Sequence, residues 1–240
     1  MAFVGAGGKT THLLHFAREL AANDRPVLVT TTTHLADPRG EENTFARILL
    51  RPDLEHSATP GSAPDPEPLG GVTLLVSRPA DEPGKLKGIH PSRIAWLRTA
   101  WDLVLVEADG SKRLPVKAPA SREPVVPDGT DLVVGVIGLD ALGEPMDERT
   151  VHRPELFASV TGCAPGHAIG WDHLVALARH PDGLFKGTGC PRVVLLNKVD
   201  ASPFLPSPGQ LAGLGADLVL LSGTADGGRS YYTARRERVP

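Results

Sequence analysis

The residues best suited to chemistry lie near the start of the chain, in a glycine-rich segment that ends in a lysine and two threonines. Glycines let backbone N–H groups approach phosphate oxygens closely and allow positive φ angles. The N-terminus of a following helix adds a partial positive charge. In such a segment the lysine reaches the β- and γ-phosphates and supports catalysis, while the first threonine ligates Mg²⁺. The segment predicts a site for a nucleoside triphosphate and Mg²⁺, formed by Gly5, Ala6, Gly7, Gly8, Lys9, Thr10 and Thr11.

This segment departs from the common G-x-x-x-x-G-K-[ST] phosphate-binding motif, because the first glycine of that motif would fall on Phe3. It resembles the G-x-x-G-K-T-T loop of Mur-type ligases more closely. A glycine-rich turn that only caps a helix is the other interpretation. We expect Lys9 to lie in an exposed loop, so that Lys9→Ala would abolish triphosphate binding without unfolding the protein.

A second motif, Asn197-Lys198-Val199-Asp200, follows an apolar run and resembles the N-K-x-D motif of GTPases. An ionised Asp200 can accept hydrogen bonds from N1–H and the exocyclic amino group of guanine, whereas adenine would leave that carboxylate unpaired. We therefore predict that Asn197, Lys198 and Asp200 bind guanine, with Ser222 in the wall of the base pocket. A simple turn after a strand is the other interpretation, because Asn and Asp favour such positions.

Carboxylates follow another apolar run, in Leu103 to Gly110. A strand that ends in acidic residues beside a phosphate loop is where Mg²⁺ or its bound water is held. The E-x-x-G spacing resembles switch II of the SIMIBI GTPases, which implies that the Gly110 N–H bonds the γ-phosphate. We predict that Glu107 and Asp109 are catalytic and that Glu107 is also a metal ligand. The other interpretation is an acidic turn.

Hydroxyl groups follow a further apolar run, in Thr30-Thr31-Thr32-Thr33. At the C-terminal end of a strand beside the phosphate site they could hold Mg²⁺ or the γ-phosphate, and we assign Thr33 as a metal ligand. β-Branched residues also simply suit strands, so both interpretations stay open. The next residue, His34, is either catalytic or an ordinary surface group.

Four cations lie in residues 110–130, a proline-rich stretch without periodicity. A long loop of this kind inside a compact domain is usually functional or disordered. We predict that it binds an anionic second ligand near the γ-phosphate, and the competing interpretation is a solvated basic loop. The candidate substrate-binding residues are Lys112, Arg113, Lys117 and Arg122.

Short Val- and Leu-rich runs must position these motifs. The runs at 2–4, 27–29, 72–76, 103–106, 132–137, 193–196 and 218–221 predict strands buried on both faces, as in a parallel sheet. Amphipathic patterns predict helices at 10–22, near 91–100 and near 174–178, the last ending before Pro181. The alternation predicts a doubly wound, P-loop NTPase-like α/β fold in one domain, 1–240, with exposed loops near 56–71 and 110–130. Residues 201–240 look irregular.

Composition limits the function classes. The net charge of −3 gives no electrostatic reason to expect nucleic acid or an anionic membrane as partner. No apolar run approaches the ~18 residues needed to span a bilayer, and the N-terminus does not resemble a signal peptide. Cys163 and Cys190 form no CxxC pair, so we interpret them as free structural thiols. These features indicate a cytoplasmic protein. They do not decide whether the protein is a monomer or a homodimer.

Several blocks together resemble one family, the YqeC proteins, also described as selenium-dependent hydroxylase accessory or selenium cofactor biosynthesis proteins. The most specific block is EADGSKRLPVKAP, and the resemblance extends over most of the chain to residue 200. It implies an accessory factor that helps to insert or mature a selenium-containing molybdenum cofactor. Its implied partners are an anionic selenium or molybdenum cofactor species and the hydroxylase. The matching blocks are VGAGGKTT (4–11), VLVTTTTH (27–34), LVLVEADGSKRLPVKAP (103–119), REPVVP (122–127), DLVVGVIGLDALG (131–143), VHRPELFASVTG (151–162) and LFKG…VVLLNKVD (184–200).

Three function classes remain after this reading of the sequence. The favoured one is a GTPase or GTP-gated chaperone for cofactor maturation. The second is an ATP-dependent ligase or kinase, suggested by the Mur-like loop. The third is a nucleotide-binding adaptor that does not hydrolyse its ligand. Relative affinities for GTP and ATP separate the first two, and release of γ-phosphate separates both from the third.

Overall fold

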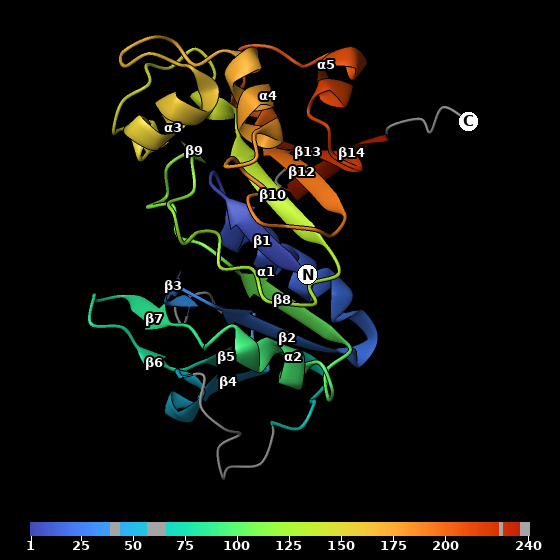
Figure 1. Ribbon diagram of the computed structural model, residues 1–240. Helices are drawn as coiled ribbons and strands as arrows, with labels where there is room; N and C mark the ends of the chain where they lie inside the picture. Colours follow the sequence, from blue (N-terminus) through green and yellow to red (C-terminus); the bar gives the residue numbers. More distant parts are fainter. Residues whose placement is uncertain (39–43, 57–65, 226–227, 236–240) are drawn as a thin grey trace. The chain divides into compact units, whose positions relative to one another are not determined.

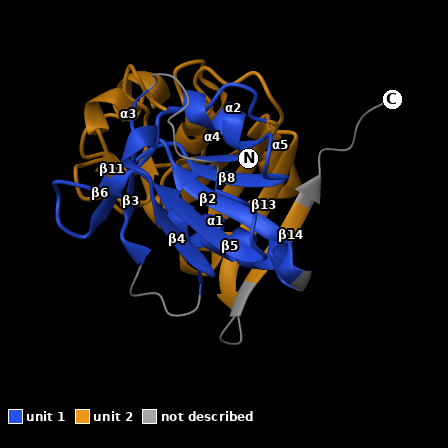
Figure 2. Ribbon diagram, turned by 90° about the horizontal axis from the view of Figure 1, so that it is seen from below, with its two compact units in different colours: residues 1–3, 9–110, 125–130 blue, residues 4–8, 111–124, 131–240 orange. Residues whose placement is uncertain are grey.

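The computed structural model describes residues 1–38, 44–56, 66–225 and 228–235 (Figure 1). Contacts between residues divide the chain into two compact units (Figure 2). Unit 1 comprises residues 1–3, 9–110 and 125–130, and unit 2 comprises residues 4–8, 111–124 and 131–240. The chain passes from one unit to the other within its first strand and again directly before Lys9.

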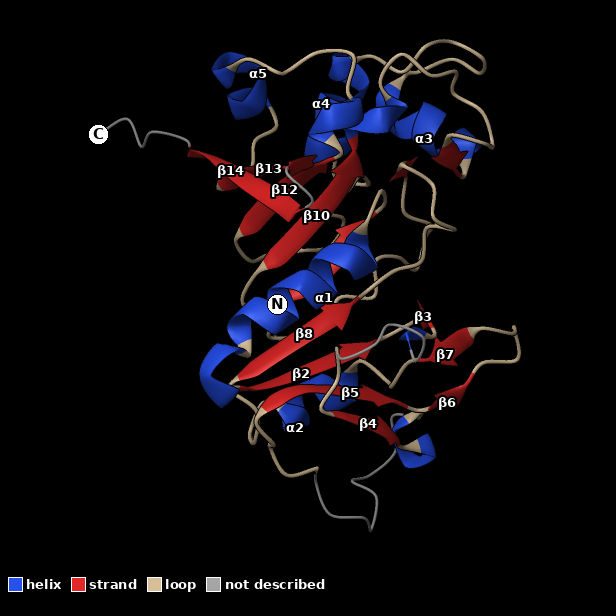
Figure 3. Cartoon of the chain, turned by 180° about the vertical axis from the view of Figure 1, so that it is seen from behind, coloured by secondary structure: helices blue, strands red, loops and turns tan. Residues whose placement is uncertain are grey.

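Unit 1 contains a parallel sheet, whose strands run side by side in Figure 3. The buried positions of its strands are mostly apolar and lie on both faces, which is the pattern that a covered parallel sheet requires. The polar exceptions are Thr30, Thr31, Thr73 and Glu107. The strand order is β1 (Ala2–Gly5, of which Ala2 and Phe3 belong to this unit), β8 (Leu103–Glu107), β2 (Pro26–Thr31), β5 (Gly71–Val76) and β4 (Arg47–Leu50).

Helix α1 (Lys9–Leu20) packs against β8 and β2 through Leu13, Leu14 and Ala17. A shorter helix, α2 (Ser92–Leu97), begins after Pro91 and buries Ile94 and Leu97. The rest of unit 1 includes a small antiparallel sheet and two short 3₁₀ helices. These elements are β3 (His34–Ala36), β7 (Lys85–Lys87), β6 (Arg78–Pro79), η1 (Ala22–Asp24) and η3 (Pro52–Leu54).

Unit 2 has a mostly parallel sheet. Its strands β10 (Val133–Gly138), β12 (Arg192–Asn197) and β13 (Leu218–Ala225) are parallel, and β14 (Gly228–Arg235) pairs antiparallel with β13. Helices α3 (Pro154–Thr161) and α4 (Trp171–Arg179) pack against each other. The remaining elements are a two-strand parallel ladder and three short helices: β9 (Val116–Lys117), β11 (Val151–His152), α5 (Pro208–Gly213), η4 (Leu139–Ala141) and η5 (Val199–Ala201).

The sequence predictions of an α/β fold, of all seven strands and of all three helices are confirmed, with ends that shift by a few residues. The expectation of an irregular C-terminal region is wrong, because β13, β14 and α5 lie there. Residues 110–130 contain only the two-residue strand β9, in agreement with a long loop. Of the predicted loop at 56–71, residues 57–65 lie outside the described residues. Within the described part of the chain, no helix combines the length and the hydrophobicity that a bilayer crossing requires.

Candidate functional site

In unit 1, two adjacent residues of α1 pair with two carboxylates at the end of β8. The Lys9 ammonium lies 3.1 Å from an Asp109 carboxylate oxygen, and both side chains are almost fully buried, at 3% and 2% exposed. The Thr10 hydroxyl donates to Glu107 Oε2 at 2.6 Å. We call these four residues the Lys9 cluster. All four were predicted from the sequence as phosphate, metal or catalytic residues, and the fold brings them together. The expectation that Lys9 lies in an exposed loop is wrong.

The geometry of the Lys9 cluster follows from the sheet register. Thr31, the last residue of β2, is paired with Glu107 in the register of β2 and β8, and its hydroxyl donates to the Glu107 carbonyl at 2.8 Å. The hydroxyl oxygen of Thr33 lies 3.4 Å from the hydroxyl oxygen of Thr31. Thr31 was not singled out from the sequence, although the threonine run was the available signal. Its contact anchors the backbone from which Glu107 projects.

The donor set of the Lys9 cluster suits Mg²⁺. This ion prefers hard oxygen ligands and few protein side chains, and Thr10 and Glu107 already place a hydroxyl and a carboxylate oxygen within 2.6 Å of each other. Thr33 is half-buried and His34 is exposed. Among the described residues, no group of three or more His, Cys, Asp and Glu side chains is arranged to hold a metal ion. A magnesium site here would therefore rely on a hydroxyl, one carboxylate and phosphate oxygens.

In unit 2, the glycine segment is held in a conformation that larger residues would not tolerate. Gly5, Gly7 and Gly8 have φ angles of +89°, +79° and +129°. A Cβ atom on Gly5 would lie 2.3 Å from the Val136 carbonyl oxygen, and one on Gly7 would lie 2.4 Å from the Gly138 nitrogen. The glycines therefore serve close backbone packing against β10, as well as the positive φ angles that the motif predicts.

The carbonyl and the N–H of Gly7 are both hydrogen-bonded within unit 2. Asn197, at the end of β12, donates from Nδ2 to the Gly7 carbonyl at 2.6 Å and is itself 5% exposed. The Gly7 N–H donates to the Leu114 carbonyl at 2.9 Å. The predicted base-recognition motif and the predicted phosphate loop are thus directly connected through Asn197. The segment that begins at Ser111 is connected to the same glycine.

The other residues of the second motif make different contacts. Lys198 has a left-handed backbone, with φ +62°, and donates from Nζ to Asp140 Oδ2 at 2.6 Å. Asp200 is exposed and accepts from the Thr224 hydroxyl at 2.7 Å. Ser222, predicted to line the base pocket, is fully buried at 0% exposed. The predicted wall of the base pocket extended over residues 221–224, and from this stretch of β13 the Thr224 side chain reaches the motif.

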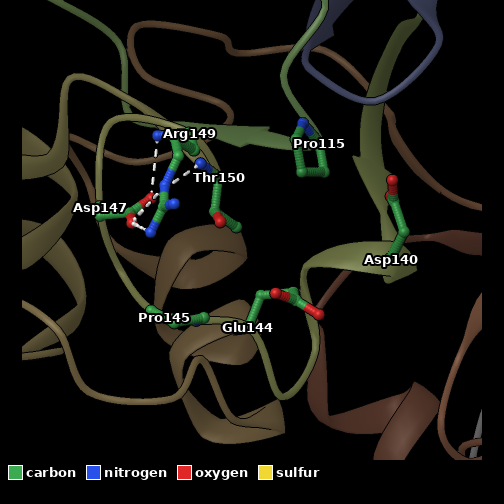
Figure 4. A pocket seen from close by; sticks show the side chains of 7 residues that line it. All are labelled: Pro115, Asp140, Glu144, Pro145, Asp147, Arg149 and Thr150. Carbon is green, nitrogen blue, oxygen red and sulfur yellow. Dashed lines mark hydrogen bonds and ion pairs between the residues drawn. The ribbon is translucent and has the colours of Figure 1, made fainter.

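A cavity of about 430 Å³ lies next to Asp140 in unit 2 (Figure 4). Two of its carboxylates are ion-paired: Asp140 with Lys198 at 2.6 Å, and Asp147 with Arg149 at 2.8 Å. Its lining residues are Pro115, Asp140, Glu144, Pro145, Asp147, Arg149 and Thr150.

The predicted substrate loop divides into exposed and buried cations. Lys112, Arg113 and Arg122 are exposed, as expected. Lys117 is buried, at 1% exposed, and its ammonium lies 2.7 Å from Glu123, so the expectation of an exposed loop residue is wrong there. Strand β9 explains this, because it pairs Lys117 with His152 of β11 and so places the lysine inside the unit.

Glu123 accepts from a second cation that the sequence analysis did not select. Arg153 donates from both terminal nitrogens to the two Glu123 oxygens, at 2.7 and 2.9 Å. Burial alone would raise the pKa of Glu123, but the hydrogen bonds from Arg153 and Lys117 outweigh it and lower this pKa to about 2. Burial, followed by the charges of Arg153, Lys117 and Lys112, lowers the pKa of His152 to about 4. The VHRPEL block of the sequence was the only available signal for these residues.

Comparisons with known proteins agree with the family resemblance. A family model described as "YqeC protein" matches residues 1–155 of the 240 residues. The "Uncharacterized protein YqeC" of Escherichia coli (strain K12) is 36% identical over 199 residues, which are 81% of this chain and 74% of that protein. No solved structure matches the chain. On both measures, the chain belongs to the YqeC family.

Proposed function

We propose that this chain binds GTP with Mg²⁺ and hydrolyses it. The observation that carries the proposal is the Lys9 cluster, in which an ammonium and a hydroxyl from consecutive residues face two buried carboxylates. Burying two charged groups away from water costs free energy unless the groups pair with each other or bind a ligand. A triphosphate gives a functional reason to keep Lys9 and Asp109 in place, because an ammonium forms strong charge-assisted hydrogen bonds with phosphate oxygens.

The residues of the cluster have distinct roles in this proposal. Lys9 exchanges its contact with Asp109 for the β- and γ-phosphates. Thr10 and Glu107 hold Mg²⁺, which supplies charge neutralisation at the phosphates. Asp109, once released by Lys9, can accept a hydrogen bond from the attacking water and orient it. Gly110, directly after these carboxylates, donates its N–H to the γ-phosphate.

Guanine specificity rests on the second motif. The side chain of Asp200 is exposed at the end of the sheet in unit 2, and its carboxylate accepts a hydrogen bond from the Thr224 hydroxyl. Guanine offers two N–H donors to such a carboxylate, and adenine does not offer this pair. Asn197 supports the base motif by holding the Gly7 carbonyl.

The biological role that we propose follows from the family resemblance. The chain would be an accessory protein for the maturation of a selenium-dependent molybdenum hydroxylase or its cofactor. GTP binding and hydrolysis would gate the hand-over of that cofactor. Reduced activity of such a hydroxylase in cells that lack this chain, restored by the wild-type chain and not by a variant unable to bind GTP, is the expected result.

A second candidate is an ATP-dependent ligase or kinase. Two observations favour it: Phe3 replaces the first glycine of the common phosphate motif, and Ser222 is too deeply buried to contact a base. A nucleotide-binding adaptor that lacks hydrolysis is the third. Release of phosphate from GTP would exclude the adaptor, and preference for ATP would favour the ligase or kinase.

The decisive experiment is a binding titration of the whole chain with GTP, ATP and XTP in the presence of Mg²⁺, repeated for Asp200→Asn. We expect wild type to prefer GTP. The amide of the variant would donate to the C2 carbonyl of xanthine, so we expect preference to move from GTP toward XTP by about a hundredfold. Thr224→Val is the matched control, since it removes the neighbouring hydroxyl and keeps the carboxylate. Unchanged GTP affinity in Asp200→Asn would contradict the guanine assignment.

A further inference from the structure

The backbone N–H of Gly7 is engaged by another segment of unit 2. It donates to the Leu114 carbonyl oxygen at 2.9 Å. In a phosphate-binding loop, the N–H groups of the glycine segment donate to phosphate oxygens instead. A backbone N–H has one hydrogen to donate, so the Gly7 N–H cannot bind a phosphate oxygen while it donates to Leu114. A donor of the candidate phosphate loop is therefore occupied by the chain itself.

The segment around this carbonyl lies directly against the glycine loop and the end of β10. The Gly138 N–H donates to the Pro115 carbonyl oxygen at 2.9 Å. A Cβ atom on Gly7 would lie 2.7 Å from the same Pro115 oxygen, and one on Gly138 would lie 3.1 Å from the Pro115 Cα atom. The segment thus contacts the backbone of two glycines that have no side chain to keep it away. We call residues 111–115 the strap.

The strap contains a turn with an unfavourable backbone. The Leu114 N–H donates to the Ser111 carbonyl at 3.0 Å, which closes a four-residue turn over Lys112 and Arg113. These two central residues have φ angles of +50° and +62°. Two consecutive positive φ angles are typical of a type I′ turn, which Gly, Asn and Asp adopt most readily. Lys and Arg carry a Cβ atom, so this backbone costs free energy that an opened strap would not require.

The surroundings of the strap allow it to open locally. Lys112 and Arg113 are exposed, and Leu114 and Pro115 are half-buried. The chain is held again immediately after the strap, because residues 116–119 are buried and β9 pairs with β11. The strap can therefore move away from the glycine loop while the rest of unit 2 keeps its fold.

We propose that residues 111–115 are an autoinhibitory strap, and that phosphate binds the glycine loop only after the Leu114 carbonyl has left the Gly7 N–H. This inference rests on the proposed function, since it takes the glycine loop to be a phosphate site. The unfavourable backbone at Lys112 and Arg113 limits the stability of the closed strap, so that a nucleotide can displace it. Nucleotide binding thereby changes the position of two exposed cations.

The first test compares Lys112→Gly/Arg113→Gly with Lys112→Ala/Arg113→Ala in the full-length chain. Both variants lack the same two charges, and they differ only in the Cβ atoms at the two positive φ angles. Glycine adopts such angles without steric cost, so the glycine variant has the more stable closed strap. We expect it to bind GTP with Mg²⁺ about tenfold more weakly than the alanine variant. Equal affinities, or tighter binding by the glycine variant, would overturn the proposal.

The second test measures amide hydrogen exchange in the nucleotide-free chain and does not require GTP. Exchange of the Gly7 N–H requires its bond to Leu114 to break, so it should be about tenfold slower in the glycine variant than in the alanine variant. The Ala6 N–H donates to the Val136 carbonyl at 2.9 Å and is the matched control, with equal exchange expected in both variants. Equal exchange at Gly7 would overturn the strap.

The two tests together separate the strap from the proposed function. Failure of the wild-type chain to bind GTP would contradict the proposed function and, with it, the control of phosphate binding by the strap. Slower exchange at Gly7 in the glycine variant would still support the strap as a contact that opens and closes. Normal GTP binding with equal exchange at Gly7 would contradict the strap alone.

Discussion

The Lys9 cluster of unit 1 and the group around Glu123 in unit 2 each contain a buried lysine paired with a carboxylate, but their charge balance differs. In the Lys9 cluster one ammonium faces Asp109, and both side chains are at most 3% exposed. Around Glu123, Lys117 and Arg153 share a single carboxylate that is 19% exposed. In the first, one cation contacts the carboxylate, and in the second, two cations contact it.

Replacing Lys9 removes the cation that contacts Asp109. Replacing Lys117 or Arg153 leaves Glu123 in contact with the other cation. In the proposed nucleotide site, an incoming phosphate would take the place of Asp109 beside Lys9. Removing one partner should therefore have different consequences in the two units.

The largest effect is expected for Lys9→Ala. The variant loses the contact to phosphate and leaves Asp109 buried without its ammonium, which typically costs about 3–5 kcal/mol of stability. We expect nucleotide binding to fall at least about a hundredfold, and the free energy of unfolding in urea to fall as well. This differs from the sequence-based expectation that the variant folds like wild type.

The double variant Lys9→Ala/Asp109→Ala is the matched control for that experiment. It should recover part of the lost stability, because no charge is left unpaired, while nucleotide binding remains absent. Wild-type stability of the single variant would show that Asp109 does not depend on Lys9. Wild-type affinity for GTP would contradict the phosphate assignment itself.

A smaller effect is expected for Glu123→Gln. The pKa of Glu123 is lowered to about 2 from 4.5, so its contribution to stability is complete above pH 4.5 and is lost as the pH falls toward 2. Since the group is partly screened by solvent, we expect a loss of about 2 kcal/mol at pH 7. Urea unfolding at several pH values should show the two proteins converging at low pH. A constant difference down to pH 2 would argue against the ion-paired carboxylate.

The smallest effect is expected for His152→Gln. The folded-state pKa of about 4 lies below the ordinary 6.5, so between these values the unfolded state binds a proton that the folded state does not. Wild type should therefore lose stability as the pH falls from 6.5 to 4, and the variant should lose less, by about 1 kcal/mol or below after allowing for exposure. Parallel pH profiles of the two proteins would contradict the lowered pKa of His152.

Much of the fold was predictable because its signals are local. Buried strands such as Val27-Leu28-Val29 are continuous apolar runs, and the helix after Lys9 shows its apolar face at Leu13 and Ala17. The strands β9 and β11 were not predictable, because two residues carry no periodicity and their pairing is decided by contacts between distant segments. Strand β14 was not predicted either, and its only partner in the described chain is β13.

The sequence by itself determined the residue types at the candidate nucleotide site: Lys9, Thr10, Glu107 and Asp109 belong to motifs whose spacing already predicts their chemistry. Only the tertiary structure decided their burial and pairing, because these depend on the register that places Thr31 beside Glu107. It also decided that Lys117 is buried and pairs with Glu123. Arg153 contacts the same carboxylate, although it lies 30 residues away from Glu123 in the sequence. Charge type is a property of the sequence, whereas charge balance depends on which groups the fold brings within a few ångströms of each other.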